Sequence, residues 1–282
     1  MPNCFFATDL HGSVGRSEKL LACILRERPF AVFLGGDLLP GCSGIVNKFD
    51  FLEDVLIPAL SDLRRDLRHD YPAVFVILGN DDPRVEEARL QQAESAGLWS
   101  YMHGRKQQVG GFEVYGYACV PPTPFLLKDW ERYDISRYVD PGCVSPEEGI
   151  RSAPPSCDEV KWQTISDDLE QLTGDNQLQN AVFLFHAPPY DTPLDHAALD
   201  GQMFEHVPLD VHVGSIAIRR FIEARQPMLT LHGHVHESTR LTGTWRTEIG
   251  RTVCINAAHD GPELALVRFD LESPAGASRE LI

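Results

Sequence analysis

The feature that most constrains this chain is a series of short apolar runs, each of which ends in a polar turn that is often rich in glycine. Eight such runs occur in the 282 residues, and β-branched and aromatic residues dominate them. Continuous apolar runs of this length are typical of strands that are buried on both faces of a sheet. The predicted strands are residues 4–9, 30–37, 73–81, 112–118, 181–189, 228–236, 252–259 and 263–271.

Amphipathic helical patterns fill the gaps between these runs. Ser17 is a candidate N-cap for the first helix, and Pro58 predicts a kink or a break in the second. Because strands alternate with helices in the first part of the chain, right-handed crossovers and parallel pairing are expected, so the predicted fold class is mixed α/β. The helices predicted after the first are residues 48–67, 83–95, 158–172 and 215–225.

The length of the chain bounds its domain organisation. With 282 residues it can bury one large core, so a single domain over residues 1–282 is predicted, with two domains as the alternative. Residues 121–157 carry "VPPTPF", "DPGCVSPEEG" and "SAPPS", too much proline and glycine for regular elements. We expect this segment to be a surface insertion that forms a rim over a functional site. We also expect the chain after Leu271 to be frayed.

Charge limits the partners that the chain can have. It contains 25 basic and 41 acidic residues, which gives a formal net charge of −16. Nucleic-acid backbones are bound by Lys and Arg side chains, so no stable nucleic-acid partner is expected. A small anionic substrate requires a local positive charge in such a protein, and bound metal ions would supply one.

Three further features concern location. No apolar run approaches the roughly 20 residues that cross a bilayer, so no membrane association is expected. The first residues, "MPNCFFATDLHG", have neither the basic nor the long apolar segment of a secretory signal. Seven cysteines without a CxxC pair predict reduced thiols, and therefore a cytoplasmic location.

Residues able to bind a metal follow five of the predicted strands. The first strand ends in "TDLHGS", the second in "GGD" and the third in "GNDD", while "FHAPP" and "HGHVH" belong to two later strands. Functional groups in such sheets gather beyond the carboxyl ends of the strands. Residues at positions i and i+2 of an extended chain point to the same side, so D-x-H and H-x-H can each turn toward one ion. The mixture of nitrogen and oxygen ligands suits Mn, Fe, Zn or similar divalent ions.

Each of these pieces has an alternative interpretation when it is taken alone. An Asp after two glycines is a common turn residue, and a single His in an apolar strand is often a hydrogen-bonded core residue. The ordered set D-x-H, GD, GN, H and GHxH, with every member at a strand end, is what chance does not readily produce.

This ordered set, from Thr8 to His236, resembles the calcineurin-like metallophosphoesterase superfamily. The stretch "HVGSIAIRRFIEARQPMLTLHGHVHES" is similar, more loosely, to a subgroup of small prokaryotic phosphoesterases. The resemblance implies a four-layer αββα sandwich with two mixed β-sheets, the metallo-dependent phosphatase fold. It also implies two metal ions: one held by Asp9, His11 and His236, the other by Asn80, His186 and His234, with Asp37 as the bridge between them.

The resemblance further implies a metal-dependent hydrolase of phosphate esters in which a metal-bound hydroxide is the nucleophile. The expected partner is a small anionic phosphate-ester substrate, and a phosphodiesterase is the favoured type. The oligomeric state stays open, a homo-oligomer included. The alternative is a scaffold of the same fold with little or no turnover, and a nuclease is disfavoured by the negative charge.

Several residues near the motifs have more than one interpretation. Many members of the superfamily have a His after the Asn, where this chain has Asp81. Asp81 has three interpretations. It is an acid at a helix N-terminus, it orients a water molecule, or it indicates a substrate whose leaving group needs little help from a proton donor. Asp82 and Pro83 are expected to start the next helix. Arg16 is a candidate contact for a substrate phosphate or an ordinary residue of a helix start, and His232 is expected to support the ligands or the core.

Overall fold

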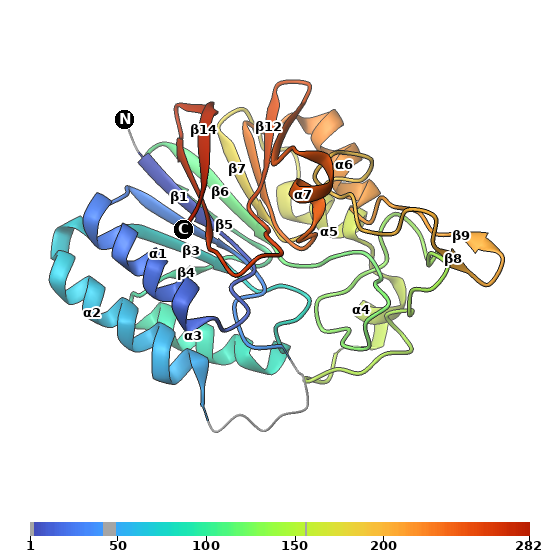
Figure 1. Ribbon diagram of the computed structural model, residues 1–282, viewed down its shortest axis with the longest axis horizontal. Helices are drawn as coiled ribbons and strands as arrows, with labels where there is room; N and C mark the ends of the chain where they lie inside the picture. The colour runs from blue at the N-terminus through green and yellow to red at the C-terminus, as the bar shows by residue number, and fades with distance from the viewer. Residues whose placement is uncertain (1–2, 42–48, 156) are drawn as a thin grey trace.

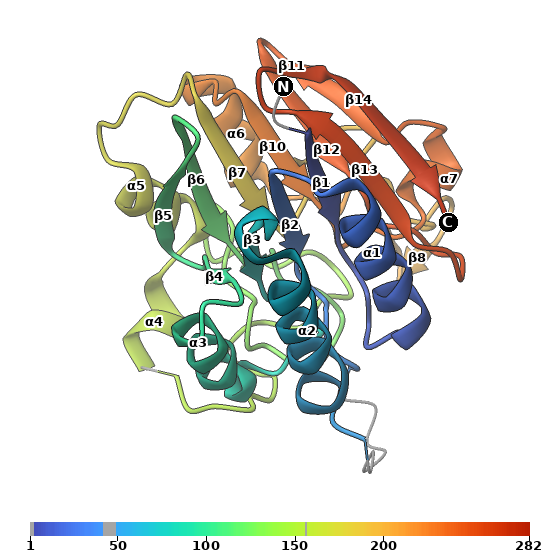
Figure 2. The ribbon, with the colours of Figure 1, turned by 90° about the vertical axis from the view of Figure 1, so that its left-hand side faces the viewer.

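Two six-stranded mixed sheets form the centre of the protein. The computed structural model describes residues 3–41, 49–155 and 157–282. One sheet has the strand order β14-β13-β1-β2-β3-β4, and the other has the order β11-β12-β10-β7-β6-β5. The sheets lie face to face, with helices on the outer side of each (Figures 1 and 2). The predicted four-layer αββα sandwich is confirmed.

The first sheet contains the first four strands of the chain together with the last two. Its strands β1, β2, β3 and β4 are parallel, while β13 and β14 are antiparallel to their neighbours. Residues after Leu271 are not frayed, because they form the edge strand next to β13. The bounds are β1 (Asn3–Ala7), β2 (Ala31–Gly35), β3 (Ala73–Ile77), β4 (Ser100–Tyr101), β13 (Ala265–Asp270) and β14 (Ser273–Leu281).

The second sheet contains four parallel strands, β6, β7, β10 and β12, with an antiparallel strand at each edge. All eight predicted strands are present in the two sheets, although most predicted ranges run a few residues past the observed strand end. The bounds are β5 (Arg105–Val109), β6 (Phe112–Tyr117), β7 (Ala181–Phe185), β10 (Leu229–His232), β11 (Arg246–Ile249) and β12 (Thr252–Asn256). A short hairpin of β8 (Met203–Phe204) and β9 (Val207–Pro208) stands apart from both sheets.

Helices α1, α2 and α3 cover the first sheet, and α5 and α6 cover the second (Figures 1 and 2). The predicted helix 158–172 is two helices, and α7 was not predicted. The bounds are α1 (Val14–Glu27), α2 (Ile57–Leu67), α3 (Glu87–Ser95), α4 (Cys157–Trp162), α5 (Ile165–Thr173), α6 (Ile216–Arg225) and α7 (Ser238–Thr242), with short turns η1 (Leu52–Leu56), η2 (Arg68–Asp70) and η3 (Arg84–Glu86).

The predictions for Ser17 and Pro58, both made for the starts or interiors of helices, have different outcomes in the structure. The N-cap of α1 is Ser13, which accepts a hydrogen bond from the backbone N–H of Arg16, so the assignment of Ser17 is wrong by one turn. Ser17 is buried inside α1 and donates to the carbonyl oxygen of Ser13. Pro58 stands in the first turn of α2, directly after the π-helical turn η1, so the predicted irregularity is a change of helix type. Lys48, where this helix was predicted to begin, lies outside the described residues.

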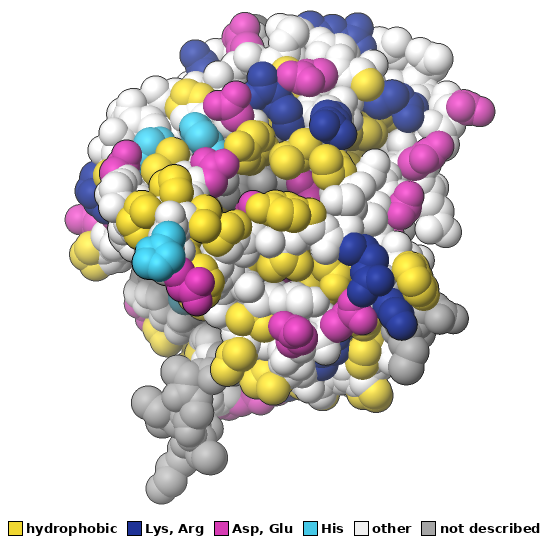
Figure 3. Space-filling model, turned by 90° about the vertical axis from the view of Figure 1, so that its right-hand side faces the viewer, with side chains coloured by type: hydrophobic (Ala, Val, Ile, Leu, Met, Phe, Trp, Pro, Cys, Tyr) yellow, Lys and Arg dark blue, Asp and Glu magenta, His cyan; other side chains and the backbone are white. Residues whose placement is uncertain are grey.

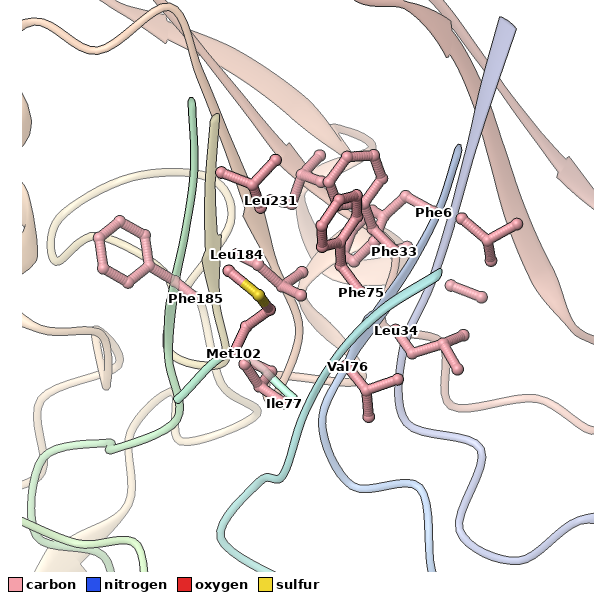
Figure 4. Close-up of a cluster of buried hydrophobic side chains, with 14 of the residues drawn as sticks. Phe6, Phe33, Leu34, Phe75, Val76, Ile77, Met102, Leu184, Phe185 and Leu231 are labelled. Atoms are coloured by element: carbon pink, nitrogen blue, oxygen red, sulfur yellow. The ribbon is translucent and has the colours of Figure 1, made fainter. Parts of the chain in front are cut away.

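The core fills the space between the two sheets and the space between each sheet and its helices, and alternate residues of the central strands face these two sides. Phe33 and Phe75 stack with ring centroids 5.2 Å apart, and Figure 4 shows both rings facing Leu184 and Leu231 of the opposite sheet. Phe185 lies on the other side of β7 from Leu184 (Figure 4), in contact with Phe221 of α6. The cysteines Cys4, Cys23, Cys119 and Cys254 are buried, as apolar runs predict.

The proline- and glycine-rich segment has no helix or strand over residues 121–155, all of which the structure describes, apart from isolated bridges. Its surface location, however, is wrong for residues 128–133, which are buried. Lys128 and Glu131 are fully buried as an ion pair of 2.6 Å. A buried charge needs such a partner because solvation is lost.

Two carboxylates of this segment bind the starts of helices. Asp129 accepts the backbone N–H of Arg84 at η3, and Asp134 accepts the backbone N–H groups of Ile216 and Ala217 at α6. Carboxylates at helix N-termini are stabilising. The segment is therefore fixed to both halves of the molecule.

On the face drawn in Figure 3, basic side chains stand among acidic and apolar ones and form no continuous basic surface within the described part of that face. None of the helices in residues 3–41, 49–155 and 157–282 has the length and apolar character that a membrane span requires.

Candidate metal centre

The predicted ligands all lie at or just beyond strand ends, at one end of both sheets. Strands β1, β2 and β3 of the first sheet end two to four residues before the ligands they carry. His186 directly follows β7, and two more ligands follow β10. The ligands concerned are Asp9, His11, Asp37, Asn80, His186, His234 and His236. Loops from the two sheets thus meet at one place.

Four of these side chains form a first group. Asp9, His11, Asp37 and His236 each offer one ligand atom, and these atoms lie within 4.8 Å of one another. Nε2 of His236 is 3.1 Å from Nε2 of His11 and 3.1 Å from Oδ1 of Asp9. Two imidazole nitrogens and a carboxylate that face a common point match the ligand chemistry of a divalent cation.

A second group shares Asp37 with the first. The ligand atoms of Asp37, His186 and His234 also lie within 4.8 Å of one another. Nε2 of His186 is 3.3 Å from Oδ2 of Asp37 and 3.1 Å from Oδ1 of Asn80. Nδ1 of His186 is held by the carbonyl oxygen of Gly35 at 2.8 Å, so Nε2 points into the group. Such a backbone contact fixes the ring of a metal-binding histidine.

The backbone bends sharply where several of these residues stand. Asp9, His11, Asp37 and His234 have φ angles of 55°, 46°, 49° and 72°. Non-glycine residues rarely adopt positive φ, which costs about 1–3 kcal/mol and is concentrated at functional sites. These turns direct the side chains away from the strand direction and toward one another.

Glycines in the GN and GH motifs are required by close approach. A Cβ atom on Gly79 would lie 2.2 Å from Oδ1 of Asp37. A Cβ atom on Gly233 would lie 2.7 Å from Oδ2 of Asp9. The motifs therefore have a steric cause: a side chain at either position would displace a carboxylate of the site.

The buried charges of the site balance one another in the protein alone. Burial would raise the pKa of Asp9, but the neighbouring His236 outweighs it and holds this pKa below the usual range. Burial lowers the pKa of His186, yet Asp37 raises it to about 10, and Asp9 raises that of His236 to about 9 in the same way. Burial and the charge of His186 lower the pKa of His234 to about 3. The carboxylates of Asp9 and Asp37 thus favour positive charge at the centre of the site, as the binding of a cation requires.

His232, the remaining histidine of the "HGHVH" motif, belongs to the core, as expected. It is fully buried, with Nδ1 2.8 Å from the carbonyl oxygen of Ala187 and Nε2 2.7 Å from Oγ1 of Thr230. Burial lowers its pKa to about 4, so the ring is neutral. His232 therefore supports the end of β10 without facing the metal ligands.

Asp81 faces the site and caps no helix. The turn η3 begins at Arg84 with Pro83 at its N-cap position, and Asp129 accepts the N–H of Arg84. The interpretation of Asp81 as a helix N-terminal acid is therefore wrong, although Pro83 does precede the first helical turn directly, as predicted. Oδ2 of Asp81 lies 3.7 Å from Nδ1 of His11, and the side chain is 42% exposed.

Asp82 is a functional residue that the sequence analysis did not identify. Its fully buried carboxylate accepts the backbone N–H groups of Leu38, Leu39 and Gly79 at 3.1, 2.8 and 2.9 Å. Burial, together with the nearby Asp37, raises its pKa, whereas the three backbone N–H groups oppose this shift because they bind the carboxylate form. The second Asp of "GNDD" was the available signal, but the following Pro83 suggested a helix start. Asp82 joins the loop that carries Asp37 to the loop that carries Asn80.

Arg16 is engaged by the backbone. Its guanidinium donates to the carbonyl oxygens of Asp9, at 2.6 Å, and of Gly261. A longer contact of 3.5 Å reaches the carbonyl oxygen of His259. The predicted contact with a substrate phosphate is therefore less favoured than a role in fixing the Asp9 loop.

Comparison with known proteins decides the family. The family model of the calcineurin-like phosphoesterases, which describes the sequences of that family, matches residues 4–238. This chain belongs to that family. The match includes every residue of the two groups described above.

Two solved structures share the fold of this chain, and one further protein is similar to part of its sequence. A crystal structure of TT1561 from Thermus thermophilus aligns with a TM-score of 0.58 and 15% identity over 99% of this chain and 98% of the other. A second solved structure gives a TM-score of 0.60 and 16% identity over 99% and 98% of the two chains. An uncharacterized protein of Methanocaldococcus jannaschii, MJ1162, is 36% identical over 81 residues, which are 28% of this chain and 31% of that protein.

Membership of the family sets the general chemistry. Calcineurin-like phosphoesterases are hydrolases that act on phosphate esters and generally use divalent metals, and the phosphoesterase described here has two groups of His and Asp residues that could bind them. The family thus implies a small phosphate ester as substrate.

Proposed function

We propose that this phosphoesterase is a phosphodiesterase that works with two divalent metal ions, such as Mn, Fe or Zn. The observation that supports it best is the pair of ligand groups that share Asp37. Asp9, His11 and His236 would hold one ion, Asn80, His186 and His234 the other, and Asp37 would bridge them. When bound, two such ions lower the pKa of a water molecule and stabilise the charge that develops on the phosphoryl group.

The protein's own residues hold this centre in place. The side chains of Asp9, Asp37 and His186 are at most 3% exposed, whereas those of His11 and His236 are 27% and 33% exposed. The substrate therefore approaches from the side of His11 and His236. Arg16, Asp82 and the carbonyl oxygen of Gly35 act as positioning groups, because each fixes a ligand or a ligand loop.

Asp81 favours a diester over a monoester. A phosphomonoester is largely a dianion at neutral pH, whereas a diester carries a single negative charge. The carboxylate of Asp81, 3.7 Å from His11, would repel the dianion more strongly than the monoanion. An Asp at this position also accepts a hydrogen bond from water, so we assign it the role of orienting a water molecule near the leaving group.

Hydrolysis of bis-p-nitrophenyl phosphate tests the proposal. The protein is stripped with EDTA, reloaded with Mn²⁺ and compared with Asp37→Ala and with the matched control Asp62→Ala, whose carboxylate is 63% exposed on α2. We expect turnover that depends on Mn²⁺, loss of both turnover and metal in Asp37→Ala, and no change in the control. A fully loaded protein that hydrolyses neither this diester nor a panel of monoesters would favour a scaffold without turnover instead.

Asp81 requires its own comparison. We expect Asp81→Ala to lower kcat by about tenfold or more, since positioned acid and base groups contribute roughly 10²–10⁴-fold and a residue that acts through water contributes less. Asp81→Asn, which also accepts a hydrogen bond from water, should retain more activity than Asp81→Ala on diesters. Equal rates for both variants and the unmodified protein would remove Asp81 from the reaction.

A further inference from the structure

A pocket adjoins the exposed side of the metal centre. It has a volume of ≈ 420 Å³, and His11 and His236 form one of its walls. Side chains of the α1 start and of the loop after β12 form the others: Leu10, Ser13, Arg16, His259, Asp260 and Pro262. Its volume lies in the range of sites for small molecules. Because two proposed ligands line it, whatever binds there is next to the reacting phosphate.

The far wall of this pocket is fixed to the metal centre by Arg16. The guanidinium donates to the carbonyl oxygen of Asp9 on one side and to that of Gly261 on the other. Residues 259–262 are thereby held at a set position relative to Asp9. A pocket whose walls are fixed before binding loses little entropy when a ligand enters.

The polar groups in the pocket indicate what kind of ligand it accepts. Asp260 is paired with Arg240 at 2.7 Å, which lowers the pKa of its carboxyl and keeps it ionised. Oδ2 of Asp260 makes this ion pair, whereas Oδ1 lies 3.9 Å from Nδ1 of His259, beyond hydrogen-bond distance, and can accept a hydrogen bond from a ligand. Nε2 of His259 is held by Glu263 at 3.1 Å, and its side chain is 18% exposed. The carboxylate disfavours a second anionic group and favours hydroxyl donors, while the exposed Pro262 provides an apolar surface for carbon atoms.

We propose that this pocket binds one ester substituent of the phosphodiester substrate, and that the substituent is a compact, uncharged, hydroxylated group of the glycerol or sugar type. Asp260 accepts hydrogen bonds from its hydroxyl groups, and Arg16 positions the wall that carries Asp260. The inference rests on the proposed phosphodiesterase function and adds the class of substrate. Neither the metal motifs nor the family assigns a role to residues 259–262.

Two esters that differ only in their hydroxyl groups test this proposal. 2,3-Dihydroxypropyl p-nitrophenyl phosphate and propyl p-nitrophenyl phosphate share one leaving group, so their reacting atoms are the same. For the Mn²⁺-loaded protein we expect kcat/KM to be about tenfold or more higher for the dihydroxypropyl ester, because a hydrogen bond to a charged group stabilises a complex by at least that factor. Asp260→Ala should remove this preference. Arg240→Ala, which breaks the ion pair but leaves the acceptor in place, should retain most of it.

A binding measurement gives a readout that does not depend on turnover. The dissociation constants of 2,3-dihydroxypropyl methylphosphonate and propyl methylphosphonate, measured by calorimetry on the Mn²⁺-loaded protein, should differ by a similar factor, and Asp260→Ala should equalise them. Hydrolysis of both esters with no preference, or a preference that survives in Asp260→Ala, overturns the assignment of the pocket and leaves the proposed function intact. Hydrolysis of neither ester by fully loaded protein overturns the proposed function, and the inference with it.

Discussion

Asp82 offers the sharpest test of how the site is built, because one carboxylate holds two ligand loops together. Its Oδ2 accepts the N–H groups of Leu38 and Gly79, and its Oδ1 accepts that of Leu39. In Asp82→Ala all three buried N–H groups lose their partner, at about 1–3 kcal/mol each. The sum approaches the whole stability of an ordinary domain, about 5–15 kcal/mol, so this variant is expected to fold poorly.

Asp82→Asn is the informative variant. An amide oxygen in the place of Oδ2 keeps the bonds from Leu38 and Gly79, and the amide NH₂ then faces the N–H of Leu39 and loses that bond. The expected decrease in the free energy of unfolding is therefore about 1–3 kcal/mol. Because Leu38 and Leu39 directly follow Asp37, we also expect Mn²⁺ affinity to fall by about 10–100-fold, the usual effect of changing a group that supports a metal ligand.

Urea unfolding followed by circular dichroism in EDTA gives the first quantity, and calorimetric titration of Mn²⁺ gives the second. Asp62→Asn, an exposed carboxylate on α2, is the matched control and should change neither. An Asp82→Asn protein with unchanged stability and unchanged Mn²⁺ affinity would show that these hydrogen bonds do not organise the site.

Two further predictions concern stability. Burial lowers the pKa of His232 to about 4, so a fall in pH from 7 to 5 protonates this residue only in the unfolded chain and should lower the free energy of unfolding by about 2 kcal/mol. Urea unfolding in EDTA at both pH values should show a smaller loss of stability for His232→Asn than for the unmodified protein. An equal loss in both proteins would refute this. Asp134 accepts the N–H groups at the start of α6, so Asp134→Ala should lower stability by about 1–2 kcal/mol in the same assay, and an unchanged value would exclude this role.

The sequence was sufficient where one local pattern determines one structure. Apolar runs predicted all eight central strands, since a strand buried on both faces has to be apolar throughout. The edge strand β14 was missed because Ser273–Leu281 contains proline, glycine and polar residues, and its pairing with β13 is a tertiary effect. The burial of Lys128 was missed for a similar reason, because its partner Glu131 neutralises it only in the folded chain.

The candidate metal site also combines features that local sequence predicts with features that depend on tertiary contacts. The family resemblance that the ordered motifs carry named seven side chains, and the fold brings these together because each follows a strand end. That they bind metal stays a prediction. The helix-start interpretation of the adjacent residues Asp81 and Asp82 was wrong because sequence alone does not reveal which carboxylate faces the site and which faces the backbone. That difference depends on the course of the loop after β3, which brings the carboxylate of Asp82 against the N–H of Gly79 and against the loop that follows β2.

The number of metal ions per chain tests the central claim most directly. Protein stripped with EDTA and dialysed against Mn²⁺ is measured by elemental analysis, and its crystals by anomalous scattering. Two ions per chain are expected, both within bonding distance of Asp37, with none retained in Asp37→Ala. A single ion or none at saturating Mn²⁺, or two ions located away from Asp37, would contradict the account.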